Sequence, residues 1–178
     1  MKWYLGIDIS KGYADFVLLS DQLIQVDQTF QLDDTRQGHE HLASWLATLY
    51  KRHPDLHVDC AVESTGGFED NWYALLLKLS STLSIRVARL NPSVVKNASK
   101  AMLNANKTDA ESAREIASYL KRFEDQVDYR VRSDHYTSFR SLHNHLELVK
   151  KQKTQVINEL KQLLYFASKA SLTGCLSY

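Results

Sequence analysis

Two carboxylates stand in or at the end of apolar runs that are typical of buried β-strands. Asp8 lies inside the first such run of the chain, and Glu63 ends the run that begins at His57. A carboxylate in such a place is costly unless it is paired, hydrogen-bonded or bound to a metal ion. A third acid, Asp109, opens a predicted helix, where the helix dipole by itself favours a negative charge. Asp8 and Glu63 are therefore the stronger candidates for chemistry, and Asp109 joins them if the fold brings the three together.

The pattern of apolar residues predicts the elements that position these acids. Three runs separated by short, turn-like gaps indicate an antiparallel meander of strands, after which helical and extended periods alternate. The predicted strands cover residues 3–9, 13–19, 23–32, 57–63 and 84–90, and predicted helices begin near residues 35, 68, 92 and 108. The order β-β-β-α-β-α-β-α implies a mixed five-stranded sheet with helices on its faces, which is the α/β layout of the ribonuclease H-like fold.

In that topology the three acids meet at one edge of the sheet. The first and fourth strands are neighbours, so Asp8 and Glu63 converge, and a helix that presents Asp109 across the edge completes an oxygen-rich pocket. Three carboxylates repel one another unless a cation lies between them. Hard oxygen ligands suit Mg²⁺ or Mn²⁺, and two such ions would activate a nucleophile and stabilise the leaving oxygen in phosphodiester chemistry.

Four short motifs occur in order between residues 5 and 117. They are Gly6-Ile7-Asp8-Ile9-Ser10-Lys11, Glu63-Ser64-Thr65-Gly66, Asn91-Pro92, and Lys107-Thr108-Asp109 with Ala113, Ile116 and Ala117. Together they resemble the DEDD transposase family, which includes insertion-sequence transposases and Piv-type DNA invertases. The resemblance implies a RuvC-like N-terminal domain in which four acids bind divalent metal. Asp8, Glu63 and Asp109 match the first three of these acids and are the expected catalytic and metal-binding residues.

The fourth acid of the family pattern is missing. The family places it three residues after the third acid, a spacing that keeps both side chains on one helix face, and Ser112 occupies that position in this chain. Glu111 lies about 200° round the helix from Asp109 and is a poor substitute. Ser112 would be a weak, neutral metal ligand, so we expect at least one metal ion to bind more weakly than in a complete site.

A helical segment over residues 129–178 follows the predicted catalytic domain of residues 1–128. Its apolar residues step by three and four, with Lys153 at the one skipped position. The apolar positions are Phe139, Leu142, Leu146, Val149, Val156, Leu160, Leu163, Ala167 and Ala170. This heptad pattern favours a coiled coil between two copies or within a hairpin, and the alternative is a single amphipathic helix packed on the domain. The family resemblance also implies dimer contacts in this segment, and we expect a homodimer through residues 139–170.

Basic residues are concentrated in the same segment. Residues 130–178 hold eight Lys and Arg against three Asp and Glu, whereas residues 1–129 carry net negative charge. A basic tail on an acidic body is compatible with nucleic-acid contact, although a solvated basic helix has the same composition. The candidates for phosphate contacts are Lys107, Arg130, Arg132, Arg140, Lys150, Lys151 and Lys153. The expected partners are DNA and, as the resemblance implies for some members, a structured guide RNA.

Composition argues against several other classes of protein. Asp8 interrupts the N-terminal apolar run before it reaches the length of a signal peptide, and no stretch approaches the roughly 18 apolar residues of a membrane span. Cys60 and Cys175 fit no metal or redox spacing. These features predict a cytoplasmic protein that does not act at a membrane.

The sequence therefore predicts the N-terminal domain of a DNA transposase or site-specific recombinase. Full-length members of the resembled family continue into a C-terminal transposase domain. Nothing in this sequence matches that domain, so we expect a truncated or naturally short relative that is inactive or weakly active alone. One alternative, favoured by Ser112, is a non-catalytic module that binds nucleic acid or dimerises. The other is an actin-like or sugar-kinase ATPase, which shares the strand start Gly-Ile-Asp-Ile but needs glycine-rich loops, and the chain has only six glycines.

Overall fold

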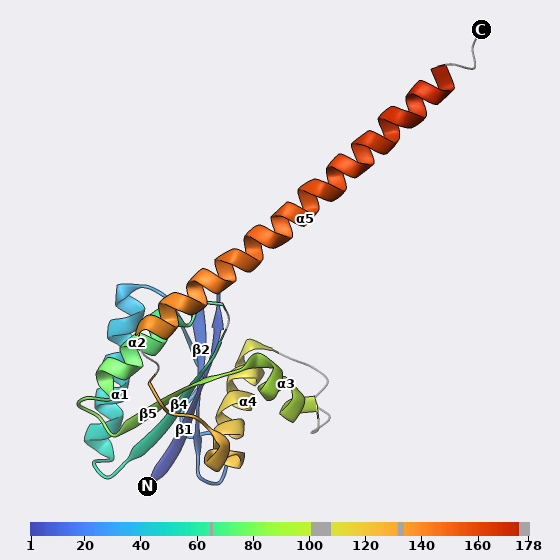
Figure 1. The fold of residues 1–178 in the computed structure, drawn as a ribbon. Helices are drawn as coiled ribbons and strands as arrows, with labels where there is room; N and C mark the ends of the chain where they lie inside the picture. The colour runs from blue at the N-terminus through green and yellow to red at the C-terminus, as the bar shows by residue number, and fades with distance from the viewer. Residues whose placement is uncertain (65, 101–107, 132–133, 175–178) are drawn as a thin grey trace. The chain divides into compact units, whose positions relative to one another are not determined.

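The computed structural model describes residues 1–64, 66–100, 108–131 and 134–174 (Figure 1). The chain divides into two compact units, Met1–Val131 and Arg132–Tyr178. The first unit is built round a sheet, and the second contains one long helix.

A five-stranded sheet forms the centre of the first unit. Its strands are β1 (Lys2–Ser10), β2 (Tyr13–Ser20), β3 (Phe30–Asp33), β4 (His57–Glu63) and β5 (Ile85–Leu90), in the order β3-β2-β1-β4-β5. The pairs β1–β2 and β2–β3 are antiparallel, whereas β1–β4 and β4–β5 are parallel. This is the mixed sheet that the sequence predicts. Because β1 and β4 are parallel neighbours, their carboxyl ends lie at the same edge.

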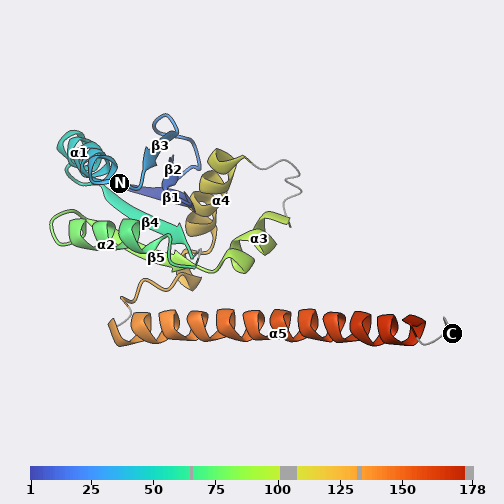
Figure 2. The same ribbon diagram turned by 90° about the horizontal axis from the view of Figure 1, so that it is seen from above.

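Helices cover both faces of this sheet (Figure 2). The helices of this unit are α1 (Arg36–Arg52), α2 (Asp70–Leu79), α3 (Pro92–Lys100), α4 (Asp109–Arg122) and the short 3₁₀ helix η1 (Glu124–Gln126), and α5 (Asp134–Gly174) belongs to the second unit. Side chains of a strand alternate between the two faces. In β4, Val58, Cys60 and Val62 join the core that α1 and α2 cover, and Ala61 joins the core that α4 covers. Every second strand residue therefore faces α4, and the candidate acids must be assigned to one of these faces.

The β1–β2 hairpin is closed by a tight turn. Ser10 pairs with Tyr13, so only Lys11 and Gly12 connect the two strands. Gly12 has a φ of 94°, a conformation that glycine adopts without a steric penalty. The turn and the buried faces together set the register of this hairpin.

The third strand is shorter than the sequence predicts. The alternating pattern predicts a strand over residues 23–32, but β3 covers only Phe30–Asp33. The Asp27 carboxylate instead accepts a hydrogen bond from the Gln28 amide at 2.8 Å and one from the Trp45 indole at 3.0 Å. Local bonds between side chains and backbone compete with a strand ladder, and the segment before Phe30 therefore forms a loop.

α4 lies directly against β1 at Gly6. A Cβ added to Gly6 would lie 1.9 Å from the carbonyl oxygen of Ala113 and 2.5 Å from the amide nitrogen of Ala117. Only a residue without a side chain allows this approach. Because Asp8 projects from the same face of β1 as Gly6, the contact holds the first turns of α4 close to Asp8.

The second unit contains α5, and large apolar side chains along the described part of this helix are exposed. The exposed heptad positions are Phe139, Leu142, Leu146, Val149, Val156, Leu160 and Leu163. A helix is thus present where the sequence predicts one, and its pairing into a coiled coil stays a prediction. Within the described ranges, no helix combines the length and the apolar character that a membrane crossing requires.

Candidate metal-binding active site

Three carboxylates form a row across adjacent strands at the carboxyl end of β1. Asp8 lies directly opposite Asp15 of β2. On the other side of Asp8, Glu63 ends β4 one residue beyond the paired Ile7 and Val62. Residues opposite one another in a sheet project from the same face, so Asp15, Asp8 and Glu63 share the face that α4 covers. The structure brings Asp8 and Glu63 together in this row and adds Asp15, which is not among the residues predicted from the sequence.

Asp109 reaches the same face from the first turn of α4. The preceding Thr108 caps the helix: its hydroxyl accepts from the Glu111 amide at 3.2 Å, and the Glu111 carboxylate accepts from the Thr108 amide at 2.9 Å. This reciprocal capping box fixes the start of the helix and engages Glu111 away from metal binding. The Asp109 carboxylate accepts a hydrogen bond from the Tyr13 hydroxyl at 3.1 Å, which joins α4 to β2 at the site.

Burial and neighbouring negative charges raise the pKa of Asp8 to about 6, from an ordinary value of 3.8. The charges that add to burial are those of Glu63, Asp109 and Asp15. Burial also raises the pKa of Asp15, a hydrogen bond from Gln31 opposes the shift, and Asp109 adds to it. The four acids therefore interact electrostatically on one face of the sheet.

Ser112 lies on the β4 side of this site. It lines a pocket of about 260 Å³ together with Glu63, Lys96 of α3 and Glu115 of α4. The position of the missing family acid thus adjoins Glu63 and a lysine. Since serine is neutral, the β4 side of the site carries less negative charge than the family pattern would place there.

The donor set matches a hard divalent cation. Carboxylate oxygens from β1, β4 and α4 and one hydroxyl are ligands that Mg²⁺ and Mn²⁺ accept, and the mutual repulsion of the acids favours a cation among them. In the part of the chain that the structure describes, however, no three His, Cys, Asp or Glu side chains are grouped so as to hold a metal ion. The fit therefore rests on the chemistry of the donors and on the elements that carry them.

The loop after β4 is held by the buried carboxylate of Glu69. This carboxylate accepts hydrogen bonds from the Ser64 hydroxyl at 2.9 Å and the Gly67 amide at 2.8 Å, and it lies 3.6 Å from the Arg89 guanidinium. Gly67 takes a φ of 118°, which favours glycine. These contacts set the path of the chain directly after Glu63.

A further buried acid, Asp59, lies on the α4 face at the opposite end of the sheet. Its two carboxylate oxygens accept from the Arg86 guanidinium at 2.7 and 2.6 Å, and Lys2 lies 3.0 Å away. Burial works against ionisation, but the hydrogen bonds from Arg86 and Lys2 hold the pKa of Asp59 below its ordinary value. Because this charge is matched by two cations, Asp59 is a structural anion.

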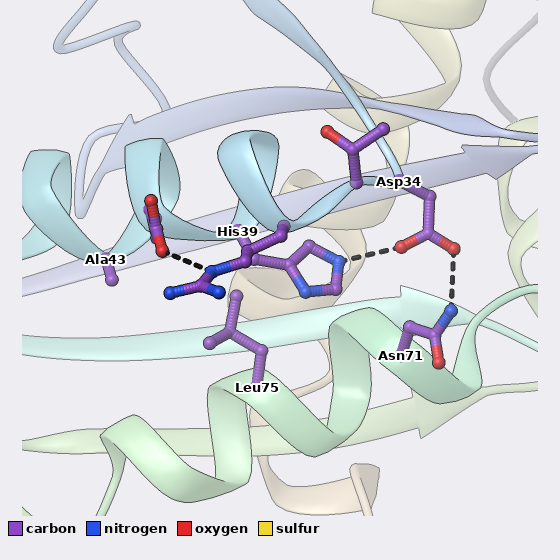
Figure 3. Close-up of a pocket in the computed structure, with 8 residues that line it drawn as sticks. Asp34, His39, Ala43, Asn71 and Leu75 are labelled. Atoms are coloured by element: carbon purple, nitrogen blue, oxygen red, sulfur yellow. Dashed lines mark hydrogen bonds and ion pairs between the residues drawn. The ribbon is translucent and has the colours of Figure 1, made fainter.

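A pocket of about 460 Å³ lies on the other face of the sheet, between the first turns of α1 and α2 (Figure 3). Asp34 lies between two partners there: one oxygen contacts His39 Nε2 at 2.7 Å, and the other accepts from the Asn71 amide at 2.9 Å. Both oxygens are used to tie the start of α1 to α2. The arrangement is therefore a structural clamp on the face away from the acidic row.

The structure shows some of the predicted nucleic-acid-binding residues and not others. Lys107 and Arg132 lie outside the described residues. Arg140 is described only by its position in α5, whereas Lys151 and Lys153 of the same helix are exposed.

Two of the predicted basic residues have acidic partners. The Arg130 guanidinium lies 2.9 Å from the Asp128 carboxylate, and the Lys150 ammonium lies 2.7 Å from Glu147. Either side chain would have to leave its partner, or share it, to contact a phosphate.

Solved structures identify the fold of the first unit. RuvC from Thermus thermophilus, solved in complex with a Holliday junction substrate, has a TM-score of 0.52 at 12% identity and covers 72% of this chain and 99% of its own. Thermus thermophilus RuvC in a separate structure scores 0.48 at 12% identity, covering 71% of this chain and 98% of its own. The Holliday junction resolvase of fowlpox virus scores 0.43 at 11% identity, covering 67% and 98%. The first of these matches shows the RuvC-like form of the ribonuclease H-like layout.

The family of the chain is identified from its sequence. No curated protein sequence matches this chain significantly. The model of a family described as Transposase, that of the DEDD transposases of the IS110 type, matches residues 5–168. The match includes Asp8, Glu63 and Asp109 and most of α5, and it confirms the resemblance that the four motifs indicate. The chain belongs to the DEDD transposase family of the IS110 type.

Proposed function

We propose that this chain is the metal-dependent, RuvC-like domain of a DNA transposase or recombinase and that it acts on DNA phosphodiester bonds. The observation that carries this proposal is the row of Asp15, Asp8 and Glu63 across three strands, with Asp109 on the same face. Like charges opposite one another destabilise a sheet. A cation bound by these acids is the best explanation for such a row in a chain of the transposase family.

Asp8, Glu63 and Asp109 would hold Mg²⁺ or Mn²⁺, and Ser112 would offer a neutral ligand. A divalent ion in that place would act as a Lewis acid toward a phosphodiester. Asp8 must lose its proton to bind a cation, and its pKa of about 6 leaves it ionised at neutral pH. The Tyr13 hydroxyl donates to the Asp109 carboxylate and holds it against β2, so this side of the site is preorganised.

The substrate that we propose is branched or single-stranded DNA. The family is described as Transposase, and the RuvC relative was solved with a Holliday junction. The exposed basic residues Lys151 and Lys153, together with Arg130 and Lys150, would contact phosphates. A structured guide RNA is a further proposed partner for the same residues.

We also propose that residues 129–178 act as a pairing segment that follows a catalytic domain of residues 1–128 in the sequence. The apolar heptad positions of α5 are exposed over several turns, and a second copy of the same helix is the partner that matches their spacing. Lys153 lies within that seam, where a charged residue can set register or orientation at some cost in stability.

Ser112 favours a second candidate function, a module that binds DNA and dimerises without cutting it. The serine leaves the β4 side of the site without the acid that the family pattern places there, beside Glu63 and Lys96. In this case DNA binding would persist while metal-dependent cleavage would be absent.

Nicking of branched and single-stranded DNA in the presence of Mn²⁺ tests the first function against the second. We expect slow cleavage by the full chain that stops with EDTA and is lost in Asp8→Asn, because Asp8 is the central carboxylate of the row. Retained DNA binding with no cleavage by the wild-type chain would support the non-catalytic module. Cleavage that is equal in Asp8→Asn would exclude this site as its source.

A further inference from the structure

We propose that Asp15 acts as the fourth carboxylate of the metal site, in place of the acid that is missing at position 112. The proposal rests on the metal-dependent function proposed above and extends it to a residue of β2. It accounts for a site that has three of the four family acids at their expected positions and a fourth acid in a different strand.

The strand register places Asp15 beside two members of the site. Asp15 is the direct partner of Asp8 in the β1–β2 pair, and the Cβ atoms of such partners lie about 4.5–5.5 Å apart. Val17, two residues further on, belongs to the core that α4 covers, so Asp15 projects toward the same helix. Tyr13, two residues before it, donates its hydroxyl to Asp109. This end of β2 therefore meets both Asp8 and the first turn of α4.

Asp15 differs from the other buried acid of this face in the charges that surround it. Asp59 is fully buried and has two cations, Arg86 and Lys2, at 2.6 and 3.0 Å. Asp15 is only 7% exposed, and its hydrogen-bond donor is the neutral amide of Gln31, at 3.1 Å. Among the described residues Asp15 makes no ion pair, and its neighbour in the row, Asp8, is another acid. The neutral Gln31 amide leaves the charge of this buried carboxylate without a counter-charge, and a divalent cation among the acids would supply one.

An acid at position 15 in place of the acid at position 112 also explains how the site can tolerate Ser112. The family acid at that position would add charge on the β4 side, beside Glu63, whereas Asp15 adds charge on the β2 side, beside Asp109. With Asp15 included, the acids on this face of the sheet number four. If Ser112 only weakens the site, Ser112→Asp should strengthen metal binding. If Asp15 is a ligand, Ser112→Asp should strengthen binding only in a chain from which the Asp15 carboxylate has been removed.

Direct Mn²⁺ binding tests this dependence without any measurement of cleavage. Binding is followed on the full chain by the electron paramagnetic resonance signal of free Mn²⁺, and the Tm is measured in EDTA and in Mn²⁺. The variants are Asp15→Asn, Ser112→Asp, their double variant and Asp8→Asn. Asp55→Asn is the matched control, because it removes the same charge from an exposed loop before β4.

We expect Asp15→Asn to weaken Mn²⁺ binding about ten- to a hundredfold, as loss of a supporting carboxylate does at other metal sites. The same variant should raise the Tm in EDTA, because it removes one of several crowded negative charges and an asparagine can still accept from Gln31. Ser112→Asp should change the affinity little in the wild type and should restore it in Asp15→Asn. Asp55→Asn should match the wild type in both measurements.

Three results separate this proposal from the function on which it rests. If Asp8→Asn abolishes Mn²⁺ binding while Asp15→Asn binds as the wild type does, Asp15 is no part of the site and the proposed function stands. If Asp15→Asn lowers the Tm in EDTA, the carboxylate has a structural role and the proposal is wrong. If the wild type and Asp8→Asn bind Mn²⁺ equally, the metal-dependent function fails, and Asp15 fails with it.

Discussion

Asp8 and Asp59 are acids on neighbouring strands that face the same helix, yet their surroundings shift their pKa values in opposite directions. Burial opposes the charge of both. Hydrogen bonds from Arg86 and Lys2 overcome this effect at Asp59 and lower its pKa. At Asp8 the nearby acids add to burial and raise the pKa to about 6. Asp59 therefore stabilises the fold in its ionised form, whereas ionised Asp8 destabilises the fold until a cation neutralises its charge.

This difference predicts how stability depends on pH in the absence of metal. In the unfolded chain Asp8 loses its proton near 3.8, and in the folded chain near 6. The folded state therefore holds the extra proton between these values, and the contribution of Asp8 to stability falls as the pH rises through this window. We expect the free energy of unfolding of the wild type, relative to Asp8→Asn, to fall by about 1–2 kcal/mol from pH 4 to pH 7, after allowance for solvent screening of a partly exposed group.

Urea denaturation in EDTA at pH 4, 5, 6 and 7 measures this difference. Asp55→Asn serves as the control, and its difference from the wild type should stay constant over the same range. A difference between wild type and Asp8→Asn that does not change with pH would contradict the raised pKa.

The residues of the site could be predicted to different degrees from the sequence. Asp8 and Glu63 stand out because apolar runs surround them, and Asp109 because a family motif contains it. Asp15 carries the same signal as Asp8, since it also interrupts an apolar strand. Its relevance depends on the pairing register, which brings it opposite Asp8. Register is set by turn geometry and by the buried faces together, and apolar spacing along one strand does not contain it.

At the scale of elements, strong local signals predicted what the structure contains. The strand predicted at residues 57–63 is β4, His57–Glu63, because Val58, Cys60 and Val62 alternate along one face and two glycines follow soon after Glu63 in the sequence. The start of α4 was predicted from Thr108, whose capping box is present. The strand over residues 23–32 was wrong in its first part, because Asp27 engages Trp45 and its own backbone neighbour. The bond to Trp45 depends on a helix that follows later in the chain, so the pattern of residues 23–32 alone does not predict it.

The contact of α4 with β1 predicts that Gly6→Ala destabilises the protein by at least about 2–3 kcal/mol, because the added Cβ meets backbone atoms that cannot turn aside. The nearest of these is the Ala113 carbonyl oxygen, at 1.9 Å from the Cβ position. The helix must move away from β1, and it carries Asp109 with it. We therefore expect weaker Mn²⁺ binding together with the loss of stability, both measurable on one purified variant by urea denaturation and metal titration.

Gly12→Ala distinguishes the steric clash at Gly6 from the backbone strain of an alanine at a positive φ. Gly12 has a φ of 94°, and a Cβ there would meet nothing within 4 Å. Its replacement should cost about 1–2 kcal/mol from backbone conformation alone and leave Mn²⁺ binding unchanged. Equal effects of the two substitutions on metal binding would show that the approach of α4 at Gly6 does not position Asp109.

At the scale of the whole molecule, the exposed heptad positions of α5 predict a concentration-dependent dimer. Leu160 lies in the middle of the apolar series and is 56% exposed. A lysine there would have to be buried or would separate the seam. We expect Leu160→Lys to shift the chain from dimer to monomer, with at least a tenfold increase in the dimer Kd, as measured by sedimentation equilibrium.

Asn158→Lys is the matched control for this prediction. It adds the same charge to an exposed position of α5, two residues from Leu160 and away from the heptad series, and should leave the dimer unchanged. A wild-type chain that stays monomeric at high concentration would exclude self-pairing of α5, and the apolar positions would then need another partner.

The hairpin that brings Asp8 opposite Asp15 also affects the order in which the charges of the site come together. These two acids are seven residues apart and are joined through a tight turn, whereas Glu63 and Asp109 reach them through contacts that span much of the chain. Contacts between residues close in sequence lose less chain entropy and form sooner during folding. The repulsion between Asp8 and Asp15 therefore acts while the hairpin forms, before the sheet is complete. The charge of the site thus bears on how fast the chain folds as well as on how stable the folded sheet becomes.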